Sequence, residues 1–379
     1  MINALCSVLR RDMNSKEFPL RPMQDHQQAA IAWIKAAHDS TPDGGVGYGY
    51  YLRGYPFSAH GLGWRPSYVE TSGYIIETFY DIAQAYNDTD SAIRAEKVGR
   101  WLLTMQNIDG SFSNNSLSNA GGIVFDTGQV LFGLVRCFVE THDQAFQTAA
   151  SKAAYWLAEN LGKDGAWHAN THLGNIHTYN TRTAWAMLEY CKIFSDVKVF
   201  GAARRNLHWA LTLQTETGLF DKCSFKKNCA PDTHTIAYAI RGLFEGGLLL
   251  GDDSILASAR KAALKMTEYV APSGIIPGRV SPAGMPNNTY SCLTGNCQMA
   301  IIWFKMSRHF NDPALFKVAE VSLNFVLRTQ NIETKNKNVR GAVKGSHPIW
   351  GRYTPLAYPN WATKFLIDAI LVKQSTVRT

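Results

Sequence analysis

A unit of helix, glycine-containing turn and second helix recurs six times along this 379-residue chain. Successive turns lie 53 to 67 residues apart, which leaves room for two helices and their connections in each unit. A repeat of this kind determines the whole architecture, because each unit is one supersecondary element that buries its apolar face against its neighbours. The six turns contain Gly45, Gly110, Gly165, Gly218, Gly274 and Gly341.

The second helix of each unit is apolar nearly all round, whereas the first, such as SAIRAEKVGRWLLTMQ, is amphipathic with a charged face. Helices of the first kind are buried and helices of the second kind lie half in solvent. We therefore predict an all-α fold, an (α/α)6 toroid of six inner and six outer helices. It spans residues 1–379 as a single domain, with residues 1–24 as an N-terminal extension.

The inner helices align without gaps, and their third column contains only hydroxyl or amide residues. The aligned stretches are ETSGYIIETF from Glu70, FDTGQVLFGL from Phe125, YNTRTAWAML from Tyr179, PDTHTIAYAI from Pro231, CLTGNCQMAI from Cys292 and YPNWATKFLI from Tyr358. Side chains at these helix starts are expected to act as N-caps, above all Asp126, Asn180 and Asp232. Trp101, Trp156 and Trp209 each lie nine residues before a turn glycine, and we predict that they pack the turn against its own helix.

The composition limits the classes of partner. The formal charge of +8 is spread along the chain without a Lys/Arg block, which argues against nucleic acid and favours an anionic saccharide or a merely solvated basic surface. No apolar run approaches the roughly 20 residues of a membrane span and no signal region is visible, so a soluble cytoplasmic protein is expected. Seven cysteines argue against a disulfide framework. The oligomeric state is not determined by these features.

The inner helices of a toroid all start at one end, here called the mouth. The column after the hydroxyl column reads Gly73, Gly128, Arg182, His234, Gly295 and Trp361. A cation in the first turn opposes the helix macrodipole, so Arg182 requires a negative partner. Two alternatives remain open: a protein carboxylate, from Asp126 or Asp232, or a bound anion.

Residues able to transfer protons gather at the same helix starts. His177, Tyr179 and His234 can donate or accept protons. Glu70 and Asp126 begin adjacent inner helices and can form the carboxyl pair of a glycoside hydrolase. Each of these residues has a purely structural alternative, as a hydrogen-bonded core residue or a helix cap.

The loops before the inner helices interleave aromatic residues with hydrogen-bonding ones, a pattern typical of saccharide sites. The alternative is that these loops only cover the barrel. The predicted binding residues are His60, Trp64, Arg65, Tyr74, Asn180, Tyr290, Asn296, Trp350, Arg352, Tyr353, Asn360 and Trp361.

No cofactor is expected. Cys223, Cys229 and His234, with Cys292 and Cys297 in the next unit, are the residue types that bind zinc. The chain lacks a closely spaced CxxC pair there, and buried free cysteine is common. Zinc binding is therefore a minor alternative.

These repeats resemble the α/α-toroid superfamily of terpenoid cyclases, protein prenyltransferases and (α/α)6 polysaccharide-active enzymes. The Q-x3-G-x-F stretches from Gln106 to Phe112 and from Gln214 to Phe220 are similar to the Gln-Trp repeat of squalene cyclases, although the DxDD acid motif is absent. The inner-helix starts look most like a bacterial group of toroid proteins associated with exopolysaccharide biosynthesis. Polysaccharide lyases of this architecture use Tyr with His or Asn, and Arg, near the substrate carboxylate.

The leading hypothesis is an enzyme acting on an acidic, uronate-containing glycan by β-elimination or C5 epimerisation. Arg182, with Arg65, would hold the carboxylate, His177 or His234 would polarise it or take the C5 proton, and Tyr179 would act as base or acid. The alternatives are a glycoside hydrolase using Glu70 and Asp126, a non-catalytic glycan-binding protein, and an isoprenoid-processing toroid.

Overall fold

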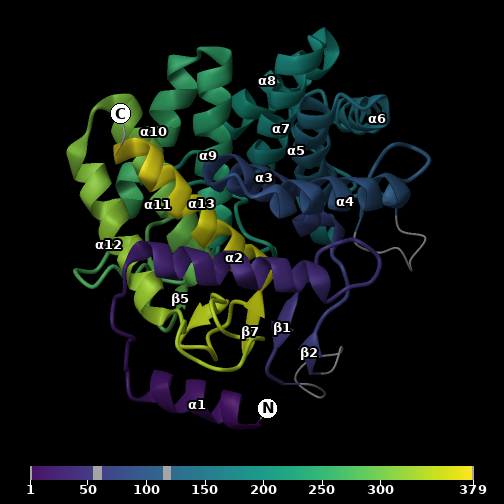
Figure 1. Ribbon diagram of the computed structural model, residues 1–379. Helices are drawn as coiled ribbons and strands as arrows, with labels where there is room; N and C mark the ends of the chain where they lie inside the picture. The colour runs from purple at the N-terminus through teal and green to yellow at the C-terminus, as the bar shows by residue number, and fades with distance from the viewer. Residues whose placement is uncertain (1, 54–61, 114–120, 378–379) are drawn as a thin grey trace.

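Six inner and six outer α-helices form a ring in the computed structural model, which describes residues 2–53, 62–113 and 121–377 (Figure 1). The inner helices are α3 (Val69–Tyr86), α5 (Val124–Thr141), α7 (Thr181–Phe194), α9 (Thr233–Leu250), α11 (Leu293–Phe310) and α13 (Asn360–Val377). The outer helices are α2 (Met23–Asp39), α4 (Thr89–Met105), α6 (Gln144–Glu159), α8 (Val197–Leu211), α10 (Asp253–Thr267) and α12 (Pro313–Thr329).

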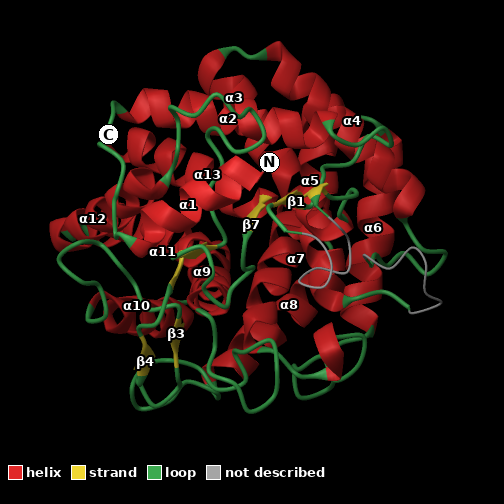
Figure 2. Ribbon diagram, turned by 90° about the horizontal axis from the view of Figure 1, so that it is seen from below, coloured by secondary structure: helices red, strands yellow, loops and turns green. Residues whose placement is uncertain are grey.

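The ring closes between the two ends of the chain. Each inner helix contacts the next, and α13 contacts both α3 and the first outer helix, α2. Strand β1 (Gly49–Tyr51) pairs antiparallel with β7 (Ala357–Pro359) and with β2 (Gly63–Trp64). The predicted (α/α)6 toroid is confirmed, and Figure 2 shows it from below as a ring of helices.

Shorter elements connect the helices. Two further strand pairs join β3 (Arg279–Val280) with β4 (Pro286–Asn287), and β5 (Ser291–Cys292) with β6 (Ser346–His347). Two 3-10 helices, η1 (His172–Gly174) and η2 (Thr178–Asn180), precede α7, and helix α1 (Ile2–Met13) precedes the ring. No helix among the described residues is long and apolar enough to cross a membrane.

Glycines allow neighbouring inner helices to approach closely at the mouth. A Cβ added at Gly73 would lie 2.6 Å from the Cα of Val130, and one at Gly295 would lie 2.9 Å from the Cβ of Thr233. These distances are shorter than any ordinary Cβ contact, so a larger residue would push the helices apart. The glycines in the column that also holds Arg182 and His234 are therefore explained by helix packing.

The six turns share one backbone geometry, and in the first turn the glycine that adopts it is not the one predicted. The turn glycines with positive φ are Gly44, Gly110, Gly165, Gly218, Gly274 and Gly341, with φ between 83° and 98°. The predicted turn residue Gly45 is thus wrong by one position, because Gly44 adopts the left-handed conformation that favours glycine.

The Q-x3-G-x-F stretches join successive repeats. Gln106 Nε2 donates to the carbonyl of Gly110 at 2.9 Å and to that of Ala149 in outer helix α6, also at 2.9 Å. Gln214 makes the equivalent bonds to Gly218 at 2.8 Å and to Ser258 in α10 at 2.9 Å. A single amide therefore ties each of these two turns to the outer helix of the next repeat.

Two of the tryptophans before the turns also pack between repeats, a contact that the sequence did not predict. A Cβ at Gly45 would meet the Trp101 ring at 2.8 Å, and one at Gly165 would meet Trp209 at 2.9 Å. Each of these two tryptophans thus contacts the turn of the preceding repeat. The reason is that an outer helix lies beside the preceding turn once the ring has formed.

The predicted N-caps are wrong. Neither Asn180 nor Asp232 makes a side-chain cap bond, and Asp126 is the third residue of α5 and not its cap. The hydroxyl column instead ties inner helices to the turns: Ser72 Oγ accepts from Val46 N and Thr127 Oγ1 accepts from Phe112 N, both at 3.0 Å. Side-chain caps occur at the outer helices, from Asp88, Asp143, Asp196, Asp252 and Asp312.

Ion pairs also connect side chains of the inner helices. Arg136 of α5 binds Asp81 of α3 at 2.9 Å, and Lys364 binds Asp368 one turn further along α13 at 2.5 Å.

We predict that Gly73→Ala lowers the free energy of unfolding by about 1–3 kcal/mol, because a methyl group there overlaps the α5 backbone. Thermal or denaturant unfolding measures this change. The matched control is Gly201→Ala in outer helix α8, where the nearest atom to the added Cβ is 3.6 Å away. The control is expected to be neutral or stabilising, and equal effects of the two variants would contradict the packing argument.

Candidate functional site

Aromatic rings from four segments meet at the mouth. Phe125 at the start of α5 lies 5.2 Å from the Tyr179 ring of η2 and 5.0 Å from the Tyr238 ring of α9. The His234 ring is 4.3 Å from Tyr238 and 5.2 Å from Tyr353, which lies in the loop before α13. The structure thus brings the predicted residues Tyr179, His234 and Tyr353 into one cluster.

Arg182 lies at the axis of the ring, 1% exposed, within a cage of aromatic rings. Its guanidinium carbon is 5.0 to 5.8 Å from five ring centroids, contributed by α3, α5, α7, α9 and α13. Cation–π attraction offsets part of the cost of burying this charge. The caging residues are Tyr74, Phe132, Trp185, Tyr238 and Phe365.

Hydrogen bonding satisfies Arg182 only in part. Its Nε donates to Gln129 Oε1 at 2.6 Å, whereas its Nη1 has no hydrogen-bond partner among the described residues. The predicted pairing with Asp232 is wrong, because that carboxylate accepts from Arg279 Nε and from the Tyr290 hydroxyl, each at 2.9 Å. Burial lowers the pKa of Arg182, although an arginine remains charged at neutral pH.

The two predicted carboxyl groups, Glu70 and Asp126, influence each other electrostatically. They occupy the second residue of α3 and the third residue of α5. A helix N-terminus favours the ionised form, yet burial raises the pKa of Glu70 well above its ordinary value, and the charge of Asp126 raises it further. The charge of Arg182 opposes this shift. Burial and the charge of Asp126 therefore both favour the protonated form of Glu70.

His234 is a neutral imidazole. Its Nδ1 lies 3.0 Å from Gln298 Oε1, which fixes the ring orientation. Burial is the main reason that the pKa of His234 is lowered to about 3. The hydrogen bond to Gln298 raises this pKa, and the charge of Arg182 lowers it further. At neutral pH the ring can donate or accept a hydrogen bond, but its low pKa makes it a weak base.

Tyr179 and His177 have different roles. The Tyr179 hydroxyl is buried without a hydrogen-bond partner among the described residues, and burial together with Glu70 raises its pKa. The His177 ring stacks on Tyr179 at 4.4 Å, and its two nitrogens face the carbonyls of Ser224 at 3.0 Å and His172 at 2.7 Å. Those contacts make His177 a support for the loops around Tyr179 and occupy both nitrogens that a proton-transfer role would need.

Several predicted binding residues hold the fold together. Asn360 Nδ2 donates to Gly47 O at 3.0 Å and to Thr71 Oγ1 at 2.9 Å, and Asn296 Nδ2 donates to Gly274 O at 3.0 Å. Trp64 lies 5.2 Å from Trp33, and its Nε1 donates to Asn338. The Tyr290 hydroxyl donates its hydrogen bond to Asp232. Asn180 and Tyr74 are buried.

The remaining predicted binding residues differ in exposure: Arg65 and Trp361 are buried, whereas two residues of the last loop are exposed. Arg65 lies 4.3 Å from the Tyr51 ring. Trp361 Nε1 donates to the Tyr353 hydroxyl at 2.8 Å. Trp350 is 44% exposed and Arg352 is exposed as well, so both face solvent. His60 lies outside the described residues.

Sequence reasoning missed four residues of this site. Gln129 and Gln298 orient Arg182 and His234, and each is an amide within an apolar inner helix, which is a signal that the sequence contains. Phe225 lies 5.7 Å from Tyr179 and 6.1 Å from His234, and His172 lies 5.6 Å from Phe225. Phe225 belongs to an irregular loop and His172 to the short 3-10 helix η1, and no periodicity predicts the position of either segment.

The cysteines proposed as zinc ligands do not assemble. The Cys223 thiol is buried and donates to the Thr235 carbonyl at 3.4 Å, whereas Cys229 is exposed. Within the described residues, no three His, Cys, Asp or Glu side chains are placed to hold a metal ion.

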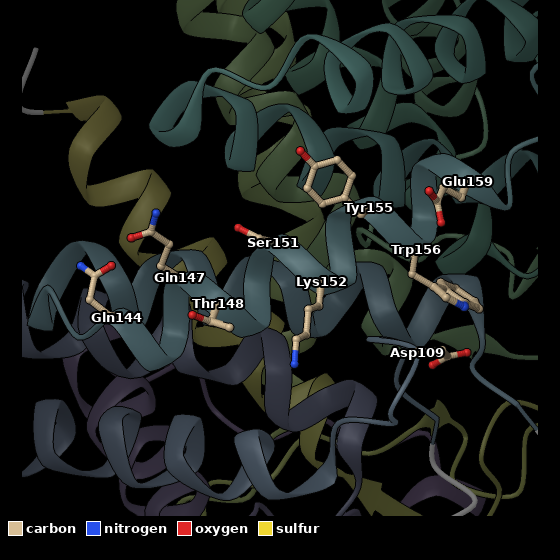
Figure 3. A pocket seen from close by; sticks show the side chains of 9 residues that line it. All are labelled: Asp109, Gln144, Gln147, Thr148, Ser151, Lys152, Tyr155, Trp156 and Glu159. Atoms are coloured by element: carbon tan, nitrogen blue, oxygen red, sulfur yellow. The ribbon is translucent and has the colours of Figure 1, made fainter.

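A groove of about 540 Å³ lies on the outside of the ring, along α6 (Figure 3). Apart from Asp109, its lining residues all come from this one outer helix, and they include Lys152, Tyr155 and Glu159. None of the predicted site residues lines it, so the groove is separate from the mouth.

Comparison with known proteins identifies the fold. No protein-family model matches the sequence, and no curated protein matches it either. Among solved structures, the unsaturated glucuronyl hydrolase of Bacillus sp. GL1 is similar with a TM-score of 0.72 at 13% identity, over 92% of this chain and 96% of that one. An unsaturated glucuronyl hydrolase specific for heparin has a TM-score of 0.72 at 14% identity, over 94% and 98%.

A third likeness is to the cellobiose 2-epimerase of Bacillus thermoamylovorans, with a TM-score of 0.69 at 12% identity, over 98% of this chain and 99% of that one. The chain has the six-hairpin (α/α)6 fold of these carbohydrate-active enzymes. At such identities the likeness establishes the fold, and the chemistry must be argued from the side chains at the mouth.

We predict that Arg182→Met raises the free energy of unfolding by about 1 kcal/mol, because methionine fills the aromatic cage without a buried, incompletely bonded charge. Thermal unfolding measures the change. The comparison variant is Arg136→Met, whose guanidinium binds Asp81 at 2.9 Å and Glu140 at 2.7 Å and whose loss should destabilise the chain. A clear loss of stability in Arg182→Met would show instead that the cage depends on the guanidinium.

Proposed function

We propose that this chain is an enzyme that cleaves a glycosidic bond in an acidic, uronate-containing saccharide, with Glu70 as the proton donor. The observation that carries the proposal is the pair formed by Glu70 and Asp126, in which burial and the neighbouring charge raise the pKa of Glu70. Two carboxyl groups with different proton affinities are what glycoside hydrolysis requires. The fold shared with sugar-acting enzymes supports the same class of substrate.

The chemistry follows from the two environments. Protonated Glu70 gives its proton to the oxygen of the scissile bond, and the charge of Asp126 stabilises the positive charge that develops at the anomeric carbon. The helix N-terminus supports the negative charge of Asp126. The Tyr179 hydroxyl, which lacks a partner among the described residues, supplies a hydrogen-bond donor within the same cluster.

Arg182 accounts for the acidic substrate. It is a permanent cation whose Nη1 has an unused donor, and its field reaches the site, because it opposes the rise in the pKa of Glu70. A buried, unsatisfied donor favours a ligand that supplies an acceptor. A uronate carboxylate supplies two acceptors in the geometry that a guanidinium matches.

β-Elimination or C5 epimerisation is the second candidate, favoured by the position of Tyr179 and His234 near Arg182. These reactions need a base, whereas burial raises the pKa of Tyr179 and lowers that of His234 to about 3. The raised pKa keeps the Tyr179 hydroxyl protonated at neutral pH, and the lowered pKa makes His234 a weak base, so neither group is well suited to take the C5 proton. The carboxyl pair is therefore the better supported chemistry, and the two reactions differ in whether the product carries an unsaturated, ultraviolet-absorbing end.

We expect purified protein given a panel of uronate-containing oligosaccharides to release reducing ends without new ultraviolet absorbance. Glu70→Gln should lower the rate about 10² to 10⁴-fold, because the proton donor is removed. Glu77→Gln is the control, since Glu77 lies on the same helix and burial raises its pKa as well, but it is two turns from the helix start. Full activity in Glu70→Gln would exclude hydrolysis by this pair.

Substrate acidity is tested in the same assay. A neutral analogue that lacks the carboxylate should react about tenfold more slowly than the uronate with wild-type protein, and Arg182→Met should remove this preference. Unsaturated products would select elimination, and saccharide binding without any turnover would select a binding protein.

A pH prediction follows from the charges around Glu70. Hydrolysis needs protonated Glu70. We therefore expect kcat/KM to be high below the raised pKa of Glu70 and to fall as the pH rises through that pKa. Arg182→Met removes the charge that lowers this pKa and should move the basic limb of the profile to higher pH. Asp126→Asn removes the negative charge that raises this pKa, so the basic limb of its residual activity should move to lower pH. Limbs that move in the same direction in the two variants would contradict the assignment of Glu70 as the proton donor.

A further inference from the structure

Helix α1 lies outside the ring, below it in Figure 1, on the side where β1, β2 and β7 lie. Its apolar residues Leu5, Val8 and Leu9 are only partly buried against the core. Terminal segments with so little burial detach easily unless a specific contact holds them. One such contact exists, and it connects α1 to the loop that carries Tyr353.

The contact is the carboxylate of Asp12, whose side chain is 2% exposed. Its two oxygens accept from Lys344 Nζ at 2.7 and 2.8 Å, and Oδ2 also accepts from the backbone N–H of Ile349 at 2.7 Å. Lys344 is buried as well, with a side chain 3% exposed, and its Nζ lies 2.9 Å from His347 Nδ1. The Asp12 carboxylate thus binds Lys344 and Ile349 directly, and it orders His347 through Lys344.

Asp12 does not stabilise helix α1 itself. It lies in the last turn of the helix, where the macrodipole disfavours a negative charge. A buried ion pair contributes little net stability relative to apolar residues of the same size, but it fixes one arrangement, because separating the partners leaves a buried charge uncompensated. This combination is suited to orienting a loop.

The loop concerned comprises residues 344–359, here called the Lys344 loop. It folds back on itself through Gly345 N to Ala357 O at 3.0 Å and Leu356 N to Ile349 O at 2.8 Å. At its tip the Tyr353 carbonyl accepts from Ser346 Oγ at 2.5 Å, and the Tyr353 ring lies 5.2 Å from His234. The residues that Asp12 binds and the residue that faces the site therefore belong to the same folded unit.

We propose that α1 is a latch for the mouth, in which Asp12 is a positioning residue that acts through Lys344 and Ile349. When the latch is engaged, the Lys344 loop holds Tyr353 against His234 and Trp361. When α1 detaches, the loop loses its buried anchor and Tyr353 loses its fixed place. The effect on catalysis rests on the proposed function, whereas the effect on the loop does not.

Amide hydrogen exchange tests the latch without any substrate. Asp12→Asn should raise the exchange rates of the Gly345, Ile349 and Leu356 amides about tenfold or more, with the amides of α9 unchanged. Glu17→Gln is the control, because it removes a neighbouring but partly exposed pair of the N-terminal segment, to Arg328 at 2.6 Å, and should leave the loop protected. Wild-type exchange rates in folded Asp12→Asn would overturn the proposal.

A double variant covers the case in which Asp12→Asn does not fold. Asp12→Asn with Lys344→Gln removes both buried charges, and its loop exchange should be no faster than that of Lys344→Gln alone, because the two residues act through one contact. Faster loop exchange in the double variant than in Lys344→Gln would overturn the coupling.

Activity provides a separate readout. With a uronate substrate that wild-type protein cleaves, Asp12→Asn should lower kcat about tenfold while the pH of the basic limb, set by Glu70, stays unchanged. An unchanged kcat would refute the link to the site. If wild-type protein cleaves no saccharide, the proposed hydrolysis fails and the exchange measurement still decides whether the latch exists.

Discussion

Closure of the inner-helix ring is the constraint on which the other features depend. The last inner helix, α13, packs against the first outer helix, α2, so the two ends of the chain complete one another. Strand pairing of β1 with β7, and the bond from Asn360 Nδ2 to Gly47 O, fasten the same junction. Without closure, no axis exists in which Arg182 can be surrounded by rings from five inner helices.

The closed ring produces the electrostatics of the site. Excluding water from the axis raises the cost of every charge there, and the cost falls differently on different groups. Burial and the charge of Asp126 raise the pKa of Glu70, burial lowers the pKa of His234 to about 3, and Arg182 remains charged within a cage of aromatic rings. Burial is the largest cause of the pKa shift of each of these three groups.

The helices around the axis, and much of the candidate site, could be predicted from the sequence. Apolar inner helices alternate with amphipathic outer ones, and a helix start at the mouth places Glu70, Asp126, Arg182 and His234 at the same end. Gln129 and Gln298 also carried a signal, as amides within apolar helices. The predicted caps failed, because the hydroxyl side chains at the inner-helix starts bond the neighbouring turns once the repeats are stacked.

The sequence by itself determined the repeat, the direction of every helix and the residue types that meet at the mouth, because these follow from periodicity along the chain. Only the tertiary structure decided which partner each polar group has. It assigned Asp232 to Arg279, Gln129 to Arg182 and Asp12 to Lys344, which is 332 residues away in the chain. Such pairings depend on where loops and ring closure place side chains in space, and spacing along the sequence carries no information about that.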